Sequence, residues 1–237
     1  MLRPGLAPYG GLCAYADALA LMDALVARPP DAPDVLLSLQ HPPTLTLGRR
    51  GGGEHLPVAV AGQISLQFPG HGAVRVDVHE IARGGSITWH APGQLVVYPI
   101  VQLARLEGPV GRGPLGDLPA FVRLLELAMQ ETCRVFGVTT VQRDGFAGLW
   151  IDDKTKIASI GVGLRSGWSF HGLALNVNPH LDAFAGIVPC GLDGVRMTSL
   201  WRELDLARMP RPALAEVEAE LVEGLKRRLR RALRSYS

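Results

Sequence analysis

Three side chains that could take part in acyl transfer lie within one stretch of the sequence, residues 156–190. Lys156 opens the stretch at the head of an apolar run, His171 lies inside FHGLALN, and Cys190 ends it in the tight turn sequence PCG. A thiol, an amine and an imidazole are the parts of a covalent acyl-transfer site. Spacing alone does not say whether the three groups meet in space.

Cys190 is the cysteine of interest among three. The other two, Cys13 and Cys133, fall near or within predicted helices and are expected to fill the core. No CxxC pair occurs and the number is odd, which favours a reducing, intracellular setting. A free thiol is only a few per cent thiolate at neutral pH, and an ammonium that lowers its pKa by one unit supplies about 1.4 kcal/mol. Lys156 could be that ammonium, whereas burial as an inert apolar residue is the alternative for Cys190.

Composition indicates an ordinary globular chain. Of 237 residues, 47% are hydrophobic and 19% are charged, and no linker, charge run or repeat marks a boundary, so we expect a single domain over 1–237. The net charge of +2 is too small to indicate nucleic acid. No apolar run is long enough to span a membrane, and the N-terminus does not resemble a signal peptide, so we expect a cytoplasmic protein. Scattered histidines and the absence of GxSxG argue against a metal site and a serine hydrolase.

A β-hairpin is expected to position Lys156 and His171. Lys156 starts a strand on the same side as Ala158, a polar turn at 165–167 reverses the chain, and His171 shares the parity of Leu173 on the return strand. Pairing of the two strands would place the lysine strand alongside the histidine strand. Other patterns predict helices at about 12–26, 119–136 and 212–233, a short helix capped near 198–201, a loop at 179–187, and strands at 35–39, 44–47, 64–68, from 74, and at 148–151.

Three further segments have competing interpretations. In ARGGSITWHAPGQL, paired glycines allow close backbone approach, although a lone histidine such as His90 is by default structural. The Arg-Gly loop at 48–53 could bind an anion, and a solvated connector is the favoured interpretation. The basic run 226–231 at the end of the last helix could attract an acidic partner; we favour cations that offset the helix dipole.

Five ordered motifs resemble the lipoyl(octanoyl) transferase family: RGGSITWHAPGQL, KIASIGV, FHGLALNVN, PCG and MTSL, with HPPTLTLGRR fitting as well. The resemblance covers about residues 9–205. It implies an α/β (α+β) fold like that of biotin and lipoate ligases, a mixed, largely antiparallel sheet flanked by helices. The implied reaction moves an octanoyl or lipoyl group from acyl carrier protein to a lysine of a lipoyl domain without ATP, as the first step of protein lipoylation.

The same resemblance implies the site. Cys190 corresponds to the acyl-thioester nucleophile and Lys156 to the residue that activates it, with no cofactor and no metal. His90 and His171 are expected beside the nucleophile. The acyl-substrate pocket is expected to comprise Arg83, Gly84, Gly85, Ser86, Ile87, Thr88, Trp89, His90, Ser159, Ile160, Gly161, His171, Gly172, Leu173 and Ala174.

The implied partners are octanoyl-acyl carrier protein as donor, and lipoyl domains of 2-oxoacid dehydrogenase complexes and the glycine cleavage H protein as acceptors. We expect a monomer with no nucleic-acid or membrane partner. An ATP-dependent lipoate or biotin ligase and a non-catalytic lipoyl-binding protein are the alternatives. The chain departs from the family pattern at Ala91, where glycine is usual, and at Trp89, where tyrosine is usual, and its loops at 51–73 and 107–118 are longer.

Overall fold

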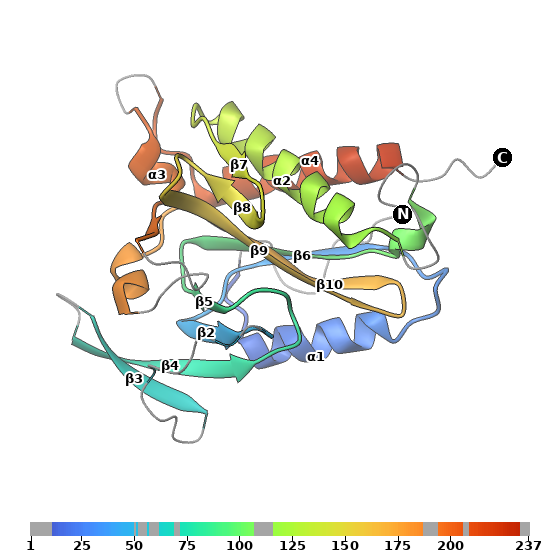
Figure 1. Cartoon of the computed structure of the whole chain (residues 1–237), viewed down its shortest axis with the longest axis horizontal. Helices are drawn as coiled ribbons and strands as arrows, with labels where there is room; N and C mark the ends of the chain where they lie inside the picture. The colour runs from blue at the N-terminus through green and yellow to red at the C-terminus, as the bar shows by residue number, and fades with distance from the viewer. Residues whose placement is uncertain are drawn as a thin grey trace.

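The computed structural model describes residues 11–49, 51, 56, 62–68, 72–106, 116–186, 194–205 and 209–232. A seven-stranded sheet forms the centre, in the order β1-β6-β10-β9-β8-β7 with β11 paired to β9 (Figure 1). All its pairings are antiparallel except β11 with β9. Its strands are β1 (Val35–Leu39), β6 (Gln94–Ile100), β7 (Val141–Arg143), β8 (Phe146–Trp150), β9 (Thr155–Arg165), β10 (Trp168–Asn176) and β11 (Arg196–Met197).

A second, four-stranded sheet has the order β3-β4-β2-β5. Here β2 and β4 are parallel, and the other two pairings are antiparallel. β5 ends at His90, and the chain turns at Ala91–Gly93 into β6 of the central sheet. This turn therefore connects the two sheets directly. The strands are β2 (Thr44–Leu47), β3 (Gln63–Phe68), β4 (Gly72–Glu80) and β5 (Ile87–His90).

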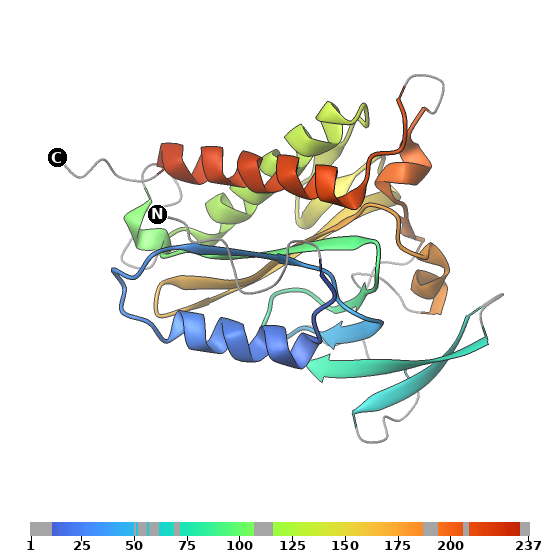
Figure 2. The same cartoon turned by 180° about the vertical axis from the view of Figure 1, so that it is seen from behind.

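Helices cover both faces of the central sheet. Helix α1 (Tyr15–Val26) packs on one face, while α2 (Leu118–Val135) and α4 (Leu214–Ala232) lie side by side on the other (Figure 2). Three short helices complete the fold: η1 (Leu103–Arg105), η2 (Leu181–Gly186) and α3 (Leu200–Glu203). None of the helices in the described ranges is both long and apolar enough to cross a membrane.

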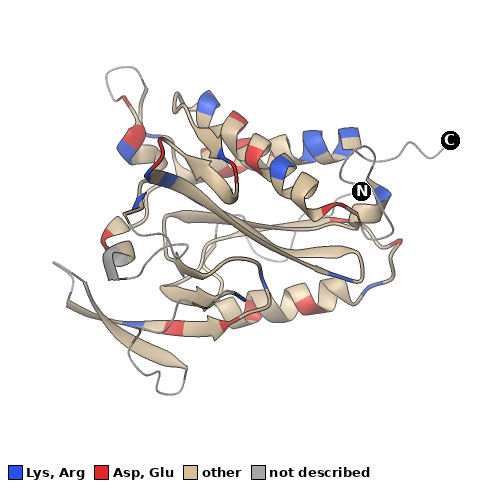
Figure 3. Cartoon of the chain, viewed as in Figure 1, with Lys and Arg blue, Asp and Glu red and all other residues tan. Residues whose placement is uncertain are grey.

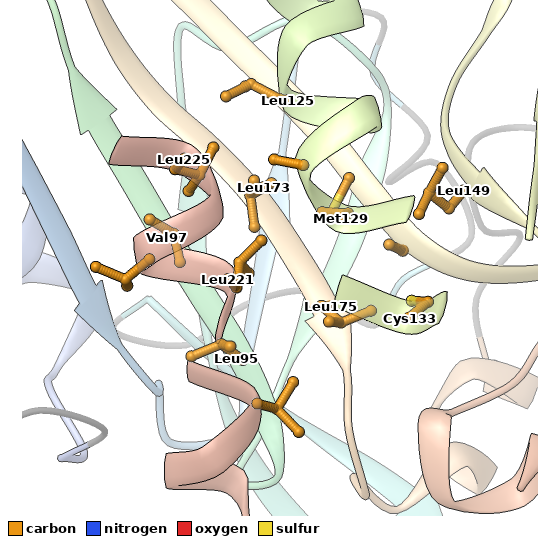
Figure 4. Packing of buried hydrophobic residues seen from close by; sticks show 14 of the residues in the cluster. Leu95, Val97, Leu125, Met129, Cys133, Leu149, Leu173, Leu175, Leu221 and Leu225 are labelled. Atoms are coloured by element: carbon orange, nitrogen blue, oxygen red, sulfur yellow. The ribbon is translucent and has the colours of Figure 1, made fainter. Parts of the chain in front are cut away.

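Alternating side chains of the central strands build a core on each face. Leu173 and Leu175 of β10 pack with Met129 and Cys133 of α2 and with residues of α4 (Figure 4). On the opposite face, Phe170 and other residues of the sheet pack against α1. Full burial of one such side chain contributes about 1.5–3 kcal/mol, so the two faces together hold the central strands in register.

The fold class expected from the sequence is confirmed, as are the three long helices, whose ends differ from the expected ones by at most three residues. Leu12 was expected at the start of the first helix, and this is wrong. Leu12 is 64% exposed and forms a bridge to Gln40, so the chain pairs here and the helix starts at Tyr15. Cys13 is only half-buried, whereas Cys133 is buried as expected.

Ala91 adopts an ordinary backbone conformation. Positive φ among the described non-glycine residues is confined to Ser166 and His171, and Gly93, with φ +89°, takes the left-handed position of this turn. A Cβ at Gly93 would also lie 2.7 Å from the backbone of Asn178. The departure at Ala91 therefore introduces no backbone strain, because the glycine two residues later supplies the necessary conformation.

Candidate active site

The β9–β10 hairpin forms the floor of the candidate site. Its turn places Ser166 at φ 50° and Gly167 at φ 81°, two positive values in succession, which is typical of a tight hairpin turn. The register then pairs Val162 with His171, Gly161 with Gly172 and Ser159 with Ala174. The second and third of the family-like motifs are thus neighbours across one strand pair.

Lys156 and His171 do not meet in this hairpin. His171 pairs with Val162, and Lys156 lies six residues earlier on β9. At about 3.3 Å per residue, the two positions are roughly 20 Å apart along the strand. The hairpin is confirmed, and the lysine strand lies alongside the histidine strand as expected, but the two side chains are not opposite each other.

His171 also faces the side opposite to the one its parity predicts. Its φ of +54° interrupts the regular alternation of β10, and its ring lies with Tyr15, Phe170 and Tyr98 on the α1 side. The backbone N–H of His171 donates to Met22 Sδ at 3.3 Å. A left-handed conformation in a non-glycine residue costs on the order of 1–3 kcal/mol, and such strain concentrates at functional sites.

A cluster of histidines and tyrosines surrounds His171, and the sequence analysis missed most of it. Tyr15 Oη lies 3.3 Å from His171 Nδ1. His41 Nδ1 donates to the Cys13 carbonyl at 2.7 Å, so its Nε2 accepts from the Tyr98 hydroxyl at 2.8 Å. The only available signals were Tyr15 on a helical stripe and His41 in an HPP turn, and neither distinguishes a site residue from a core residue.

Burial keeps the imidazoles of this cluster neutral. Desolvation lowers the pKa of His41 to about 4, and desolvation together with the nearby Arg83 charge lowers the pKa of His171 to about 3. The pKa of His90 is also lowered well below its usual value, first by burial. Desolvation raises the pKa of both Tyr15 and Tyr98. At neutral pH the cluster therefore offers uncharged donors and acceptors.

The hydrogen bonds of Gln94 set the tautomer of His90. Gln94 Nε2 donates to the Trp89 carbonyl at 3.1 Å and to Asn176 Oδ1 at 2.9 Å. Its Oε1 must then accept from His90 Nδ1, which lies 2.7 Å away. His90 Nε2 consequently carries no proton and is available as a hydrogen-bond acceptor.

Arg83 joins the two sheets at the site. Its guanidinium is buried and donates to the Thr46 carbonyl, to Thr46 Oγ1 and to the Gly84 carbonyl. A Cβ at Gly161 would lie 2.7 Å from Arg83 Cδ, and one at Gly48 would lie 2.8 Å from Arg83 Nη1. The glycines of these motifs therefore make room for the arginine side chain.

A narrow cavity of about 30 Å³ lies between these groups. Ten of the expected pocket residues line it, together with Tyr15, Val96 and Tyr98, which the sequence analysis did not select. The expected residues at the wall are Arg83, Thr88, His90, Ser159, Ile160, Gly161, His171, Gly172, Leu173 and Ala174. Gly84, Gly85, Ser86, Ile87 and Trp89 do not line it; they belong to the segment that supports Arg83 and His90.

Lys156 is buried, with 3% of its surface exposed. Its Nζ donates to the Ala147 carbonyl at 3.0 Å and lies 4.9 Å from the centre of the Trp150 ring. A Cβ at Gly148 would lie 2.9 Å from Lys156 Cε, and the Gly148 N–H donates to Glu126 Oε1 at 3.0 Å. Lys156 is not part of the cavity wall.

Cys190 lies outside the described residues. The described chain resumes at Gly194 and leads into β11, where Met197 pairs with Lys156 and Thr198 N–H donates to the Lys156 carbonyl at 2.8 Å. Within the described part of the chain, no group of three His, Cys, Asp or Glu side chains could hold a metal ion.

Comparison with known proteins places this geometry in a family. The family model described as the lipoyl protein ligase A/B catalytic domain matches residues 14–226 of this chain. The chain belongs to this family. Proteins named octanoyltransferase are 42% identical in Desulfotalea psychrophila, over 81% of each chain, and 40% identical in Mycobacterium leprae, over 85% of this chain and 80% of the relative.

Solved structures support the fold. A lipoate-protein ligase A bound with ATP has a TM-score of 0.63 at 14% identity, covering 96% of this chain and 88% of the other. A bipartite lipoate protein ligase from Thermoplasma acidophilum has a TM-score of 0.60 at 13% identity, with 97% and 87% covered. The family, the ligase-like fold and the acyltransferase class expected from the sequence are thereby confirmed.

Proposed function

We propose that this protein transfers an octanoyl group from acyl carrier protein to a lysine of a lipoyl domain through a thioester on Cys190. The identity with octanoyltransferases over most of the chain carries this proposal. The acceptors would be lipoyl domains such as those of 2-oxoacid dehydrogenase complexes and the glycine cleavage H protein. The reaction needs no cofactor, because the donor thioester is already activated.

In the first step, Cys190 thiolate attacks the donor thioester carbonyl, and the carrier thiol leaves. Lys156 would favour the thiolate, and its placement supports this role: β11, which follows Cys190 by only a few residues, pairs with β9 at Lys156. An ammonium that lowers the thiol pKa by one unit increases the thiolate nearly tenfold.

In the second step, the acceptor lysine attacks the Cys190 thioester carbonyl as a neutral amine, the amide bond forms, and the carbon–sulfur bond breaks with Cys190 leaving as the thiolate. Neutral Lys156 is the proposed base, and the unprotonated His90 Nε2 is a second acceptor at the site. Backbone N–H groups near Cys190 would stabilise the oxyanion. The Gly84 N–H cannot donate to the oxyanion in this structure, because it already donates to the Val162 carbonyl at 3.3 Å.

The cavity has to open to receive the acyl chain. Its volume of about 30 Å³ has room for about two or three water molecules. An octanoyl group places seven carbons beyond the carbonyl, and burying them would contribute on the order of 5 kcal/mol. We therefore expect the octanoyl chain to enter by displacing side chains at the cavity wall, among them the partly buried Ile160.

An ATP-dependent ligase is the second candidate, because a lipoate-protein ligase with the same fold was solved with ATP. The two candidate activities differ in the acyl donor, which is an acyl carrier protein thioester for the transferase and a free acid with ATP for the ligase. They also differ in whether a cysteine thiol is required. Octanoyl-acyl carrier protein and an apo lipoyl domain should give octanoylated lysine without ATP, and Cys190→Ser should abolish the product. Activity that requires ATP and a free acid, and that survives Cys190→Ser, would show the ligase instead.

A further inference from the structure

A basic groove of about 470 Å³ lies between α2 and α4, on the face of the central sheet opposite to α1. We define the arginine groove by the residues that line it: Leu127, Gln130, Glu131, Arg134, Thr139, Thr140, Arg227, Arg228 and Arg231. It shares no residue with the cavity of the candidate active site. Its volume is within the usual range for small-molecule sites.

The charges in the arginine groove are not balanced. Four arginines face one carboxylate, Glu131, which pairs with Arg227 at 3.5 Å and with Arg228 at 3.1 Å. The side chains of Arg134 and Arg231 have no ion pair with any residue that the structure describes. Figure 3 shows the basic residues along the C-terminal part of α4. The groove therefore has an excess of positive charge that its own residues leave available.

Two polar atoms of the groove residues are also without a hydrogen-bond partner. Thr140 is 5% exposed, and its buried Oγ1 has no partner within the described ranges, nor has the buried Nε of Arg228. Buried polar atoms are normally paired, so such atoms call for a specific explanation. An anion in the groove would supply acceptors to the Arg228 guanidinium and the Thr140 hydroxyl.

We propose that the arginine groove binds a small molecule carrying two or more phosphate groups. Arg134 and Arg231 would supply the charge that no carboxylate of the described residues neutralises, and Arg228 and Thr140 would supply hydrogen bonds at the wall. Planar guanidinium groups match phosphate oxygens in pairs, which favours a phosphate ligand over a diffuse acidic surface. A simple role in offsetting the α4 dipole would not require a groove shared with α2.

Calorimetric titration of the whole protein with inorganic pyrophosphate tests this site. Arg231→Gln and Arg134→Gln, both at exposed positions, should each weaken binding roughly tenfold. Arg230→Gln is the matched control: it removes the same charge from the neighbouring residue of α4, which does not line the groove. Binding in the control should change by less than about twofold, as expected for a screened charge outside the site.

Three results would overturn the proposal. The first is the absence of pyrophosphate binding at low ionic strength. The second is equal weakening by Arg230→Gln and Arg231→Gln, which would indicate general attraction to a basic helix. The third is binding of a poly-glutamate peptide with no binding of pyrophosphate, which would make the groove a docking surface for an acidic protein.

Discussion

Lys156 is the buried amine on which the proposed chemistry depends. Its Nζ is held by the Ala147 carbonyl and lies against the Trp150 ring, and the glycine at 148 leaves space for its side chain. Lysine is almost never fully buried without a partner or a function. Its pairing with Met197 of β11, a few residues after Cys190 in the chain, supports the proposed role of Lys156.

Replacing Lys156 with alanine should make Cys190 less reactive. Loss of the ammonium should raise the pKa of the thiol by about one unit and slow its alkylation at pH 7 roughly tenfold. Iodoacetamide labelling followed by peptide mass analysis gives the alkylation rate of Cys190. The other two cysteines should react slowly, because burial raises the pKa of Cys13 and raises that of Cys133 to about 12. Lys154→Ala, at an exposed position two residues away, is the control. An unchanged pH profile for Lys156→Ala would remove Lys156 from this role.

The sequence allowed Lys156 and most cavity residues to be selected, because the family-like motifs are contiguous and strand parity is simple. It could not place His171, because parity assumes regular strand geometry and His171 has φ +54°. Tyr15 and His41 were missed for another reason. Their contact with the cavity residues arises only when α1 and the second sheet meet the central sheet.

The contact between strands β10 and β6 leaves no room for a side chain at position 172 of the central sheet. A Cβ at Gly172 would lie 2.2 Å from the Val97 carbonyl oxygen and 2.6 Å from Pro99 Cδ. Neither neighbour is the flexible end of a side chain, and both belong to a fully buried strand. The glycine at 172 is therefore required by the packing of these strands as well as by the proposed pocket.

Gly172→Ala should destabilise the protein by about 1–3 kcal/mol, because the strands must separate to admit the methyl group. Gly224→Ala should have the opposite effect on the free energy of unfolding. Gly224 lies within α4, and a Cβ there would meet its nearest neighbour at an ordinary 3.6 Å, so alanine should stabilise by about 1 kcal/mol. Urea unfolding of both variants and of the unmodified protein measures the change in the free energy of unfolding. A stable Gly172→Ala protein would show that this sheet is looser than its register indicates.

At the scale of the whole molecule, the neutral histidines couple stability to pH. His41 and His171 have pKa values of about 4 and about 3 when folded, against about 6.5 for an unfolded chain. Below pH 6.5 the unfolded state takes up protons that the folded state does not. The free energy of unfolding therefore falls as the pH falls, by about 1.4 kcal/mol per pH unit for each such histidine.

His41→Gln should reduce this dependence. Between about pH 6 and 4.5, the slope of unfolding free energy against pH should be shallower than in the unmodified protein by about 1.4 kcal/mol per pH unit. Urea denaturation at several pH values measures the slope, which is independent of any loss of stability common to all pH values. An equal slope in the two proteins would contradict the neutral state of His41.

The positions of most helices and strands were predictable because hydrophobic period and turn chemistry are local, whereas the fold class was implied by the resemblance of the ordered motifs to a known family. The second sheet and the cluster between the sheets were not predictable, since they depend on contacts between segments far apart in the chain. The arginine groove has the same origin: the basic run in α4 is plain in the sequence, but the adjoining residues come from α2 and the segment after it.

Formation of an acyl-enzyme on Cys190 tests the central claim most directly. The protein is mixed with octanoyl-acyl carrier protein without ATP, and its intact mass is measured before any acceptor is added. We expect one octanoyl adduct on the unmodified protein and none on Cys190→Ala. The adduct should disappear when an apo lipoyl domain is added. No adduct on the unmodified protein, or an adduct that persists in Cys190→Ala, would rule out the thioester on Cys190.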